Sequence, residues 1–138
     1  MSGPTPRSLP RVAPRDATLP IEALGDALAT ETRLLGELIA ILRRQRAAVA
    51  ADDFATVDDS VFATQRVLHT LGEARRRRQA LYRALGVPDD AGPRALAVAL
   101  GPAMTPALRD ALETLVAAAR TLAAEVALNR SAIRAALR

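Results

Sequence analysis

The chain has 138 residues, of which 50% are apolar and 2% aromatic, and it carries a net charge of +4. It has no cysteine and a single histidine, which excludes disulfides, thiolate chemistry and a ligand cluster for a transition metal. The charge is too modest and too evenly spread for a dedicated nucleic-acid surface, and no apolar stretch is long enough for stable membrane insertion.

Residues 1–18 differ in composition from the rest of the chain. They contain four prolines among Ser, Gly and Arg, a composition that favours extended, solvated backbone. We therefore expect a disordered, Pro/Arg-rich N-terminal tail over residues 1–18 and one helical domain over residues 19–138. A leader without a fixed role is the simplest interpretation of the tail, and a ligand for an SH3-like groove is the alternative.

Apolar residues recur three and four residues apart along three long segments, at about residues 20–51, 53–86 and 105–137. Side chains at this spacing line one face of a helix, and such a helix is about 45 Å long. The sequence therefore predicts an all-α fold, an elongated antiparallel bundle or coiled coil of three long helices. The stripes are Ile21, Leu24, Leu28, Leu35, Leu38, Leu42 and Val49; then Phe54, Val57, Val61, Leu68, Leu71, Tyr82 and Leu85; then Leu108, Leu112, Leu115, Ala119, Leu122, Val126, Ile133 and Ala136.

Capping residues predict where the first two helices begin. The first helix is expected to start between Thr18 and Pro20, because threonine can cap and proline is tolerated in the first turn. Asp53 is expected to cap the second helix, because its carboxylate can accept hydrogen bonds from free backbone N–H groups. The break between the two helices is short, so the second should fold back along the first.

A connector rich in Pro, Gly and Asp separates the second and third long helices. Gly86 suits the end of the second helix, and Thr105 followed by proline suits the start of the third. Within the connector, residues 93–100 are expected to form a short extra helix.

Polar residues interrupt all three apolar stripes. Such residues weaken a seam between helices but can fix its register. Because two arginines stand at stripe positions late in the second helix, we expect its second half to be less buried than its first. The interruptions are Glu31, Gln45, Thr64, Arg75, Arg78 and Asn129.

Two charged clusters have ordinary explanations. The four arginines at residues 75–78 point in four directions on a helix, with no aromatic residues interleaved for base stacking, so a solvated or internally paired face is favoured over a nucleic-acid patch. The acid pairs at residues 52–53 and 58–59 lack the spaced ligands and the glycine of a calcium loop. We therefore expect no metal ion and no other cofactor.

His69 is the one residue with a catalytic or signalling alternative. The run Leu68-His69-Thr70-Leu71-Gly72 faintly resembles the phosphoacceptor helix of histidine phosphotransfer domains. In that helix the histidine is followed by Leu, Lys and Gly, whereas here the lysine is missing and Gly72 comes one place too early. The chain also has no Gly-rich phosphate loop and no recognisable Ser–His–Asp frame, so we expect no enzyme.

The end of the third helix carries more apolar surface than one stripe. Leu122, Val126, Ile133 and Leu137 share or border one face, and further apolar residues lie beside it. A face of this kind either completes the bundle or binds an amphipathic helix of another protein.

The order of the segments resembles the FlgN family of flagellar export chaperones. Residues 34–38 and 46–54 resemble the family's first helix and the turn after it, where Asp52 stands at a position that is commonly glycine. Residues 65–71 and 78–86 resemble the second helix and its Leu-Gly end. Asn129 and Ile133 match the Asn and Ile of the C-terminal helix, so the resemblance covers about residues 20–138.

This resemblance implies a cytoplasmic, non-enzymatic chaperone of type III export. Family members bind the amphipathic C-terminal helices of hook-associated (hook–filament junction) proteins, prevent their premature polymerisation and deliver them to the export apparatus. The C-terminal helix is the usual binding element, and a homodimer remains open. The resemblance therefore predicts partner binding by Leu115, Leu122, Val126, Asn129, Ile133 and Leu137, with Asn129 setting the register of the partner.

Three other functions remain as alternatives. A histidine phosphotransfer-like module would use His69, and a plain coiled-coil scaffold would have no export role. A basic nucleic-acid binder is the third, and it would show steeply salt-dependent binding.

Overall fold

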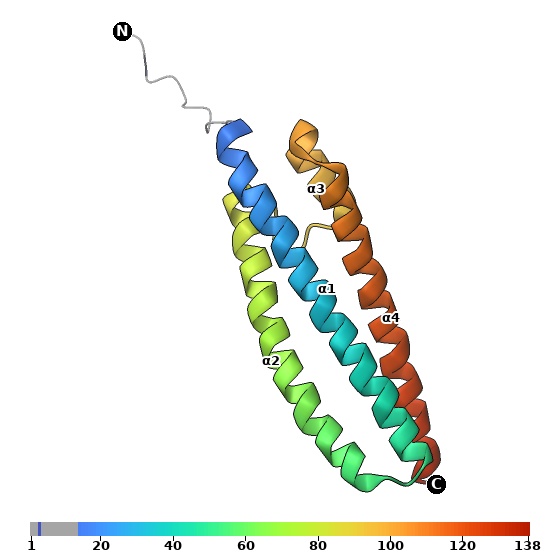
Figure 1. Ribbon diagram of the computed structural model, residues 1–138. Coiled ribbons are helices and arrows are strands. Elements are labelled where there is room, and N and C mark those ends of the chain that lie inside the picture. Colours follow the sequence, from blue (N-terminus) through green and yellow to red (C-terminus); the bar gives the residue numbers. More distant parts are fainter. Residues whose placement is uncertain (1–2, 4–13) are drawn as a thin grey trace.

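The computed structural model of the chain describes residue 3 and residues 14–138, with side chains from residue 19 onward. Helices joined by short connections make up the described residues, and none of these residues forms a strand. The predicted all-α class is therefore confirmed. The elements, labelled in Figure 1, are α1 (Pro14–Ala50), α2 (Phe54–Ala84), α3 (Pro93–Leu100), the 3-10 turn η1 (Gly101–Ala103) and α4 (Pro106–Ala136).

The long helices α2 and α4 share one neighbour, α1. The chain turns back after α1 so that α2 runs in the opposite direction, and α4 then runs in the same direction as α1 (Figure 1). Both contact α1 along its length, whereas no Cα atom of α2 comes within 8 Å of one in α4. The three predicted long helices are present, but the bundle is open along one of its seams.

The start of α1 differs from the prediction. α1 begins at Pro14, ahead of the expected start between Thr18 and Pro20. A proline in the first turn loses nothing, because its missing N–H has no partner there, and Pro14 meets this condition as well as Pro20 does. Pro20 instead lies inside α1, where its ring removes one backbone hydrogen bond. The predicted tail at residues 1–2 and 4–13 lies outside the described residues.

The predicted caps are confirmed at three helix ends. Asp53 accepts a hydrogen bond from the backbone N–H of Thr56 at 3.1 Å, and the Thr105 hydroxyl accepts one from the N–H of Leu108 at 3.1 Å. Gly86, two residues after α2, has a φ of +71°, a left-handed conformation that glycine adopts without strain. The short connector helix α3 also has the predicted bounds.

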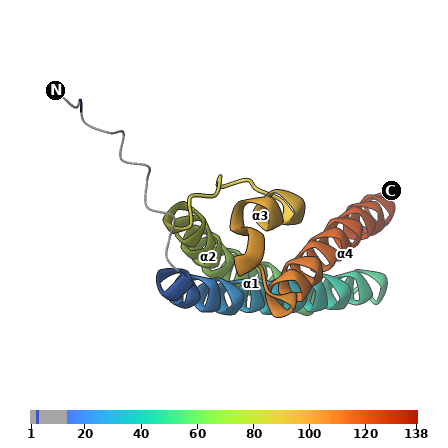
Figure 2. The ribbon, with the colours of Figure 1, turned by 90° about the horizontal axis from the view of Figure 1, so that it is seen from above.

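The upper half of the molecule, at the top of Figure 1, is closed by α3. Seen from above, α3 lies between α2 and α4 on one side of α1 (Figure 2). Leu96 of α3 is fully buried in a core cluster to which α1, α2 and α4 all contribute. We call it the upper cluster; its buried members are Leu24, Leu28, Tyr82, Val87, Leu96, Leu108 and Leu112.

A second, smaller core cluster lies nearer the middle of the long helices. Partly buried apolar residues of α2 and α4 pack against it, among them Leu115 and Leu122. Below this middle cluster, α3 no longer covers the space between α2 and α4 (Figures 1 and 2). The buried members of the middle cluster are Leu34, Leu35, Leu71 and Ala74.

The prediction that the second half of α2 is the less buried half is wrong. Tyr82 near the end of α2 is buried in the upper cluster, whereas the stripe residues Phe54, Val61 and Leu68 in the first half are exposed. The difference follows from coverage, because α3 and its connector close over the end of α2.

Arg78 lies in that covered half of α2, where its charge is paired. Its Nε donates a hydrogen bond to Oε1 of the buried Glu31 at 2.6 Å, and its guanidinium lies 5.5 Å from the ring centre of Tyr82. Burial alone would lower the pKa of Arg78, but the hydrogen bond and charge of Glu31 outweigh it and raise the pKa. The polar position is therefore a paired core position.

Candidate functional site

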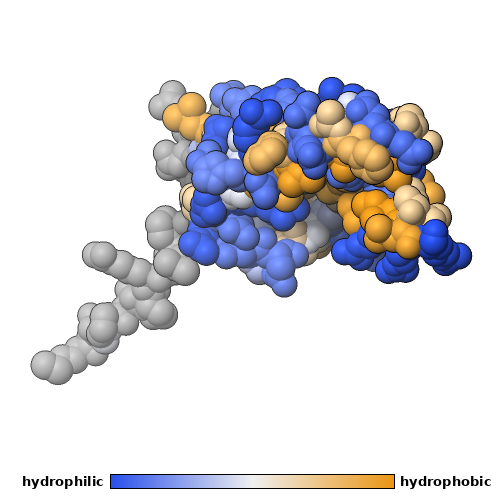
Figure 3. Space-filling model, turned by 90° about the horizontal axis from the view of Figure 1, so that it is seen from below, coloured by the Kyte–Doolittle hydropathy of each residue, from blue (hydrophilic) through white to orange (hydrophobic). Residues whose placement is uncertain are grey.

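An open groove runs between α2 and α4 below the middle cluster, with α1 as its floor. Seen from below, apolar side chains gather around a hollow at this end of the molecule (Figure 3). It lies on the same side of α1 as α3, which packs between α2 and α4 in the upper half (Figure 2). We call it the lower groove. From the helical periodicity and the buried positions of each helix, we assign to its walls Val57, Val61, Thr64 and Leu68 on α2, and Leu122, Val126, Ile133 and Leu137 on α4.

The α2 wall follows from the side of α2 that faces α1. Ser60 and Leu71 are buried and mark that side. Arg66 lies to one side of this line, because it borders a cavity on the outer seam between α1 and α2. Helical geometry places Val61 and Leu68 on the other side, toward α4. They are 44% and 50% exposed, so this wall presents apolar surface.

The α4 wall contains four of the six predicted binding residues, and three of them lie around Asn129 or beyond it. Asn129 is buried against α1, and Val126 and Ile133 lie three residues before and four residues after it, on neighbouring parts of the same face. Val126 is half-buried, Ile133 is 39% exposed and Leu137 is 82% exposed. Uncovered apolar surface therefore increases toward the end of α4.

Leu115 and the wall residue Leu122 lie higher on α4, where both are half-buried and pack against the middle cluster. Leu122 is the point where the core seam passes into the α4 wall of the lower groove. The structure thus divides the predicted face into an upper part that is mainly core and a lower part that is mainly surface.

A polar cluster joins all three long helices at the level of the lower groove. The Asn129 side chain donates to the backbone O of Leu42 at 2.7 Å and to Gln45 Oε1 at 3.0 Å, and its Oδ1 accepts from Arg46 Nη1 at 2.9 Å. Gln45 in turn donates to Ser60 Oγ on α2 at 3.1 Å. The members of this polar cluster are Arg43, Gln45, Arg46, Ser60, Glu125 and Asn129.

Glu125 supplies the charge of the polar cluster. Its carboxylate accepts hydrogen bonds from Arg46 Nη1 and from Arg43 Nε, the latter at 3.0 Å, and its side chain is nearly buried. The hydrogen bonds from Arg46 and Arg43 hold the pKa of Glu125 below its ordinary value. α4 is therefore attached to α1 in one register by charged groups as well as by apolar contacts.

The structure gives Asn129 a role other than the expected one. The sequence suggested that its amide would set the register of a bound partner, but both ends of this amide are hydrogen-bonded to α1. Sequence reasoning also missed Glu125 and Arg46. The available signal was the four-residue spacing of Glu125 and Asn129, which places two polar groups on one side of an otherwise apolar helix.

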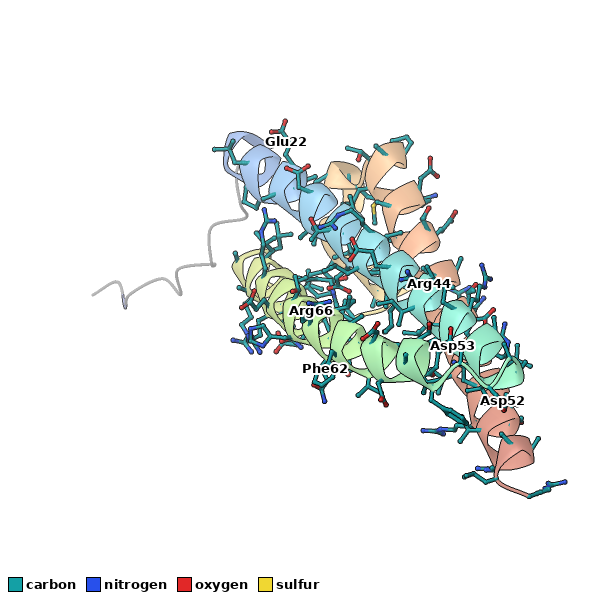
Figure 4. All side chains as sticks on the ribbon, turned by 60° about the horizontal axis from the view of Figure 1, so that its bottom comes forward. Glu22, Arg44, Asp52, Asp53, Phe62 and Arg66 are labelled. Carbon is teal, nitrogen blue, oxygen red and sulfur yellow. The ribbon has the colours of Figure 1, made fainter. Side chains whose placement is uncertain are left out.

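The outer seam between α1 and α2 holds a cavity of about 520 Å³. Figure 4 shows Arg44 on α1, Arg66 on α2, and Phe62 pointing away from the helices. Phe62 is 65% exposed. This cavity lies on the opposite side of α2 from the lower groove, and its residues fall outside the predicted stripes.

The other candidates from the sequence stay isolated on the surface. His69 is well exposed, and its Nε2 lies 3.3 Å from Glu73 Oε1. Within residues 75–78 only Arg78 is ion-paired to another helix, and the other three arginines are exposed. Among the described residues, no group of His, Cys, Asp and Glu side chains has the arrangement of a metal site.

Comparison with known proteins identifies a matching family. The model of the FlgN family, described as "FlgN protein", matches residues 20–138. No curated protein and no solved structure matches the chain. Across the part of the chain that the structure describes, no helix combines the length and the apolarity needed to cross a membrane.

Proposed function

This chain belongs to the FlgN family, a family of flagellar chaperones, and we propose that its clients are the amphipathic C-terminal helices of hook-associated proteins. By covering the apolar stripe of such a helix, the chain prevents the client from polymerising early and delivers it to the type III export apparatus. On this proposal the chain works in the cytoplasm, without catalysis or a cofactor.

The observation that carries the proposal is the uncovered apolar end of α4. Leu137 is 82% exposed and Ile133 is 39% exposed, on a helix whose upper half is core. An amphipathic helix without its partner likewise exposes its apolar stripe to water, so the two apolar surfaces can bury each other. Burying one leucine side chain contributes about 1.5–3 kcal/mol, so a few such contacts supply useful affinity.

Replacing Leu137 by aspartate tests the proposal directly. We expect about a tenfold or larger loss of affinity for a peptide of the client's C-terminal helix, because one buried leucine is worth that factor. Helicity should persist, since Leu137 makes few contacts in the free chain. Fluorescence anisotropy with a labelled peptide measures the affinity, and circular dichroism measures the helicity.

Val98→Asp is the matched control. Val98 is 80% exposed on α3, at the far end of the molecule from Leu137. The Val98→Asp variant therefore introduces the same charge at an equally exposed apolar site outside the lower groove. Equal binding by both variants and the unmodified chain would contradict the proposed role of α4.

The exposure of His69 keeps phosphotransfer as a second candidate function. The carboxylate of Glu73 beside Nε2 stands against it, because a phosphoryl group would meet a negative charge there. Phosphotransfer requires that a phosphodonor labels the chain and that His69→Gln abolishes the label. The chaperone proposal requires that His69→Gln leaves peptide binding unchanged.

A further inference from the structure

We infer that a client helix lies in the lower groove as a fourth helix and contacts α2 as well as α4. This inference rests on the proposed function and adds the partner's position. The recognition surface would then have two walls, and Val61 and Leu68 of α2 would be binding residues alongside the end of α4.

The position of α3 is the first argument. α3 lies between the same long helices in the upper half, with its Leu96 fully buried. Leu96 belongs to a cluster that α1, α2 and α4 all form. A helix therefore fits between the three long helices in the upper half, and the lower groove lies between the same helices below it.

The chemistry of the two walls is the second argument. Every wall residue of the lower groove is uncharged, and apolar side chains on both walls are partly uncovered. The Thr64 hydroxyl on the α2 wall is buried and has no hydrogen-bond partner in the described part of the chain. A helix with an apolar stripe and one polar group near Thr64 complements these walls, whereas a charged stripe would be desolvated without a partner.

The length of the groove defines the occupant further. The α4 wall runs from Leu122 to Leu137, which corresponds to about 22 Å of helix. A client helix of about fifteen residues fills that length, with apolar residues at positions i, i+3, i+4 and i+7 to face both walls. A second copy of this chain is the competing occupant.

Variants of the α2 wall separate this inference from the proposed function. We expect the double variant Val61→Asp and Leu68→Asp to bind the client peptide about tenfold or more weakly, because both positions would bury charge. Both side chains are half-exposed in the free chain, so helicity should persist. The matched control is Phe62→Asp, which adds a charge at an exposed apolar residue on another face of α2 and should bind normally.

The outcomes are distinct. If the α2 double variant binds normally while Leu137→Asp does not, the client lies on α4 alone and the fourth-helix position is wrong, although the proposed function stands. If neither variant loses affinity, the proposed function fails as well. Loss of binding by Phe62→Asp would place the client on the outer seam and would also overturn the inference.

Crosslinking gives an independent readout that does not depend on folding of a charged variant. The chain has no cysteine, so a single cysteine with a photoreactive label can be placed at Val61, Phe62 or Ile133. We expect labels at Val61 and Ile133 to crosslink to the client peptide and a label at Phe62 not to. Crosslinks from Val61 to a second copy of the chain, persisting when client peptide is added, would identify a homodimer as the occupant and overturn the inference.

Discussion

Replacing Asn129 by alanine tests whether this residue serves the fold or the client. Asn129 is 4% exposed, and the substitution removes its hydrogen bonds to Leu42 O and Gln45 Oε1. Arg46 loses little, because it keeps its bond to Glu125. Two neutral hydrogen bonds are worth about 2 kcal/mol, and the better helix propensity of alanine returns about 0.5 kcal/mol. We expect a net loss of about 1.5 kcal/mol.

Thermal unfolding followed by circular dichroism measures this loss. For a chain of this size, 1.5 kcal/mol lowers Tm by about 5 °C. Amide exchange should accelerate most in the last turns of α4, because Asn129 attaches that end to α1. An unchanged Tm with lost peptide binding would refute the reasoning, since it would mean that the amide of Asn129 contacts the client, as the sequence alone suggested.

Three further predictions concern the turn, the upper cluster and the polar cluster. Asp52 has a φ of +53°, so Asp52→Gly should raise the free energy of unfolding by about 0.5 kcal/mol and Asp52→Val should lower it, as urea titration would show. Leu96→Ala should cost about 3 kcal/mol in the same assay, because it leaves a cavity in the upper cluster. The lowered pKa of Glu125 means that its stabilisation is complete above its ordinary pKa of 4.5 and is lost as pH falls through the lowered value. Glu125→Gln should remove this acid-dependent part of the stability. Urea midpoints of the variant and the unmodified chain, measured across this pH range, would contradict the argument if both chains lost stability equally on acidification.

The helix ends could be predicted because capping is local chemistry. Asp53, Gly86 and Thr105 act on backbone groups within three or four residues of themselves, so sequence contains both the cap and its partner. The turn before α2 is similar, since Asp52 adopts the left-handed conformation that glycine adopts most easily. Only the start of α1 misled the prediction, because two prolines met the same local condition.

The paired polar groups could not be predicted, because their partners are distant in sequence. Glu125 and Arg43 are 82 residues apart, and Arg78 and Glu31 are 47 residues apart. Read locally, each is a charge at or beside a core stripe and indicates exposure. The apolar stripe on α2 gave the opposite error, because its spacing indicated burial where the residues are exposed. Val61 and Leu68 have the spacing of core residues but are exposed, because no described element covers the lower groove. Periodicity tells which face of a helix is apolar, and it does not tell what covers that face.

The two apolar walls need something to hold them apart in the free chain, because apolar surfaces in water gain free energy by closing on each other. The polar cluster meets this need. Hydrogen bonds run from Glu125 through Arg46 to Asn129, and from Asn129 through Gln45 to Ser60, so α4, α1 and α2 are joined below the middle cluster. Bonds of this kind are directional, and moving the end of α4 toward α2 would break those that Glu125 makes with α1. Above the lower groove, α3 fills the gap with Leu96. The groove is therefore supported at one end by a packed helix and along its floor by hydrogen bonds, which hold the two walls apart.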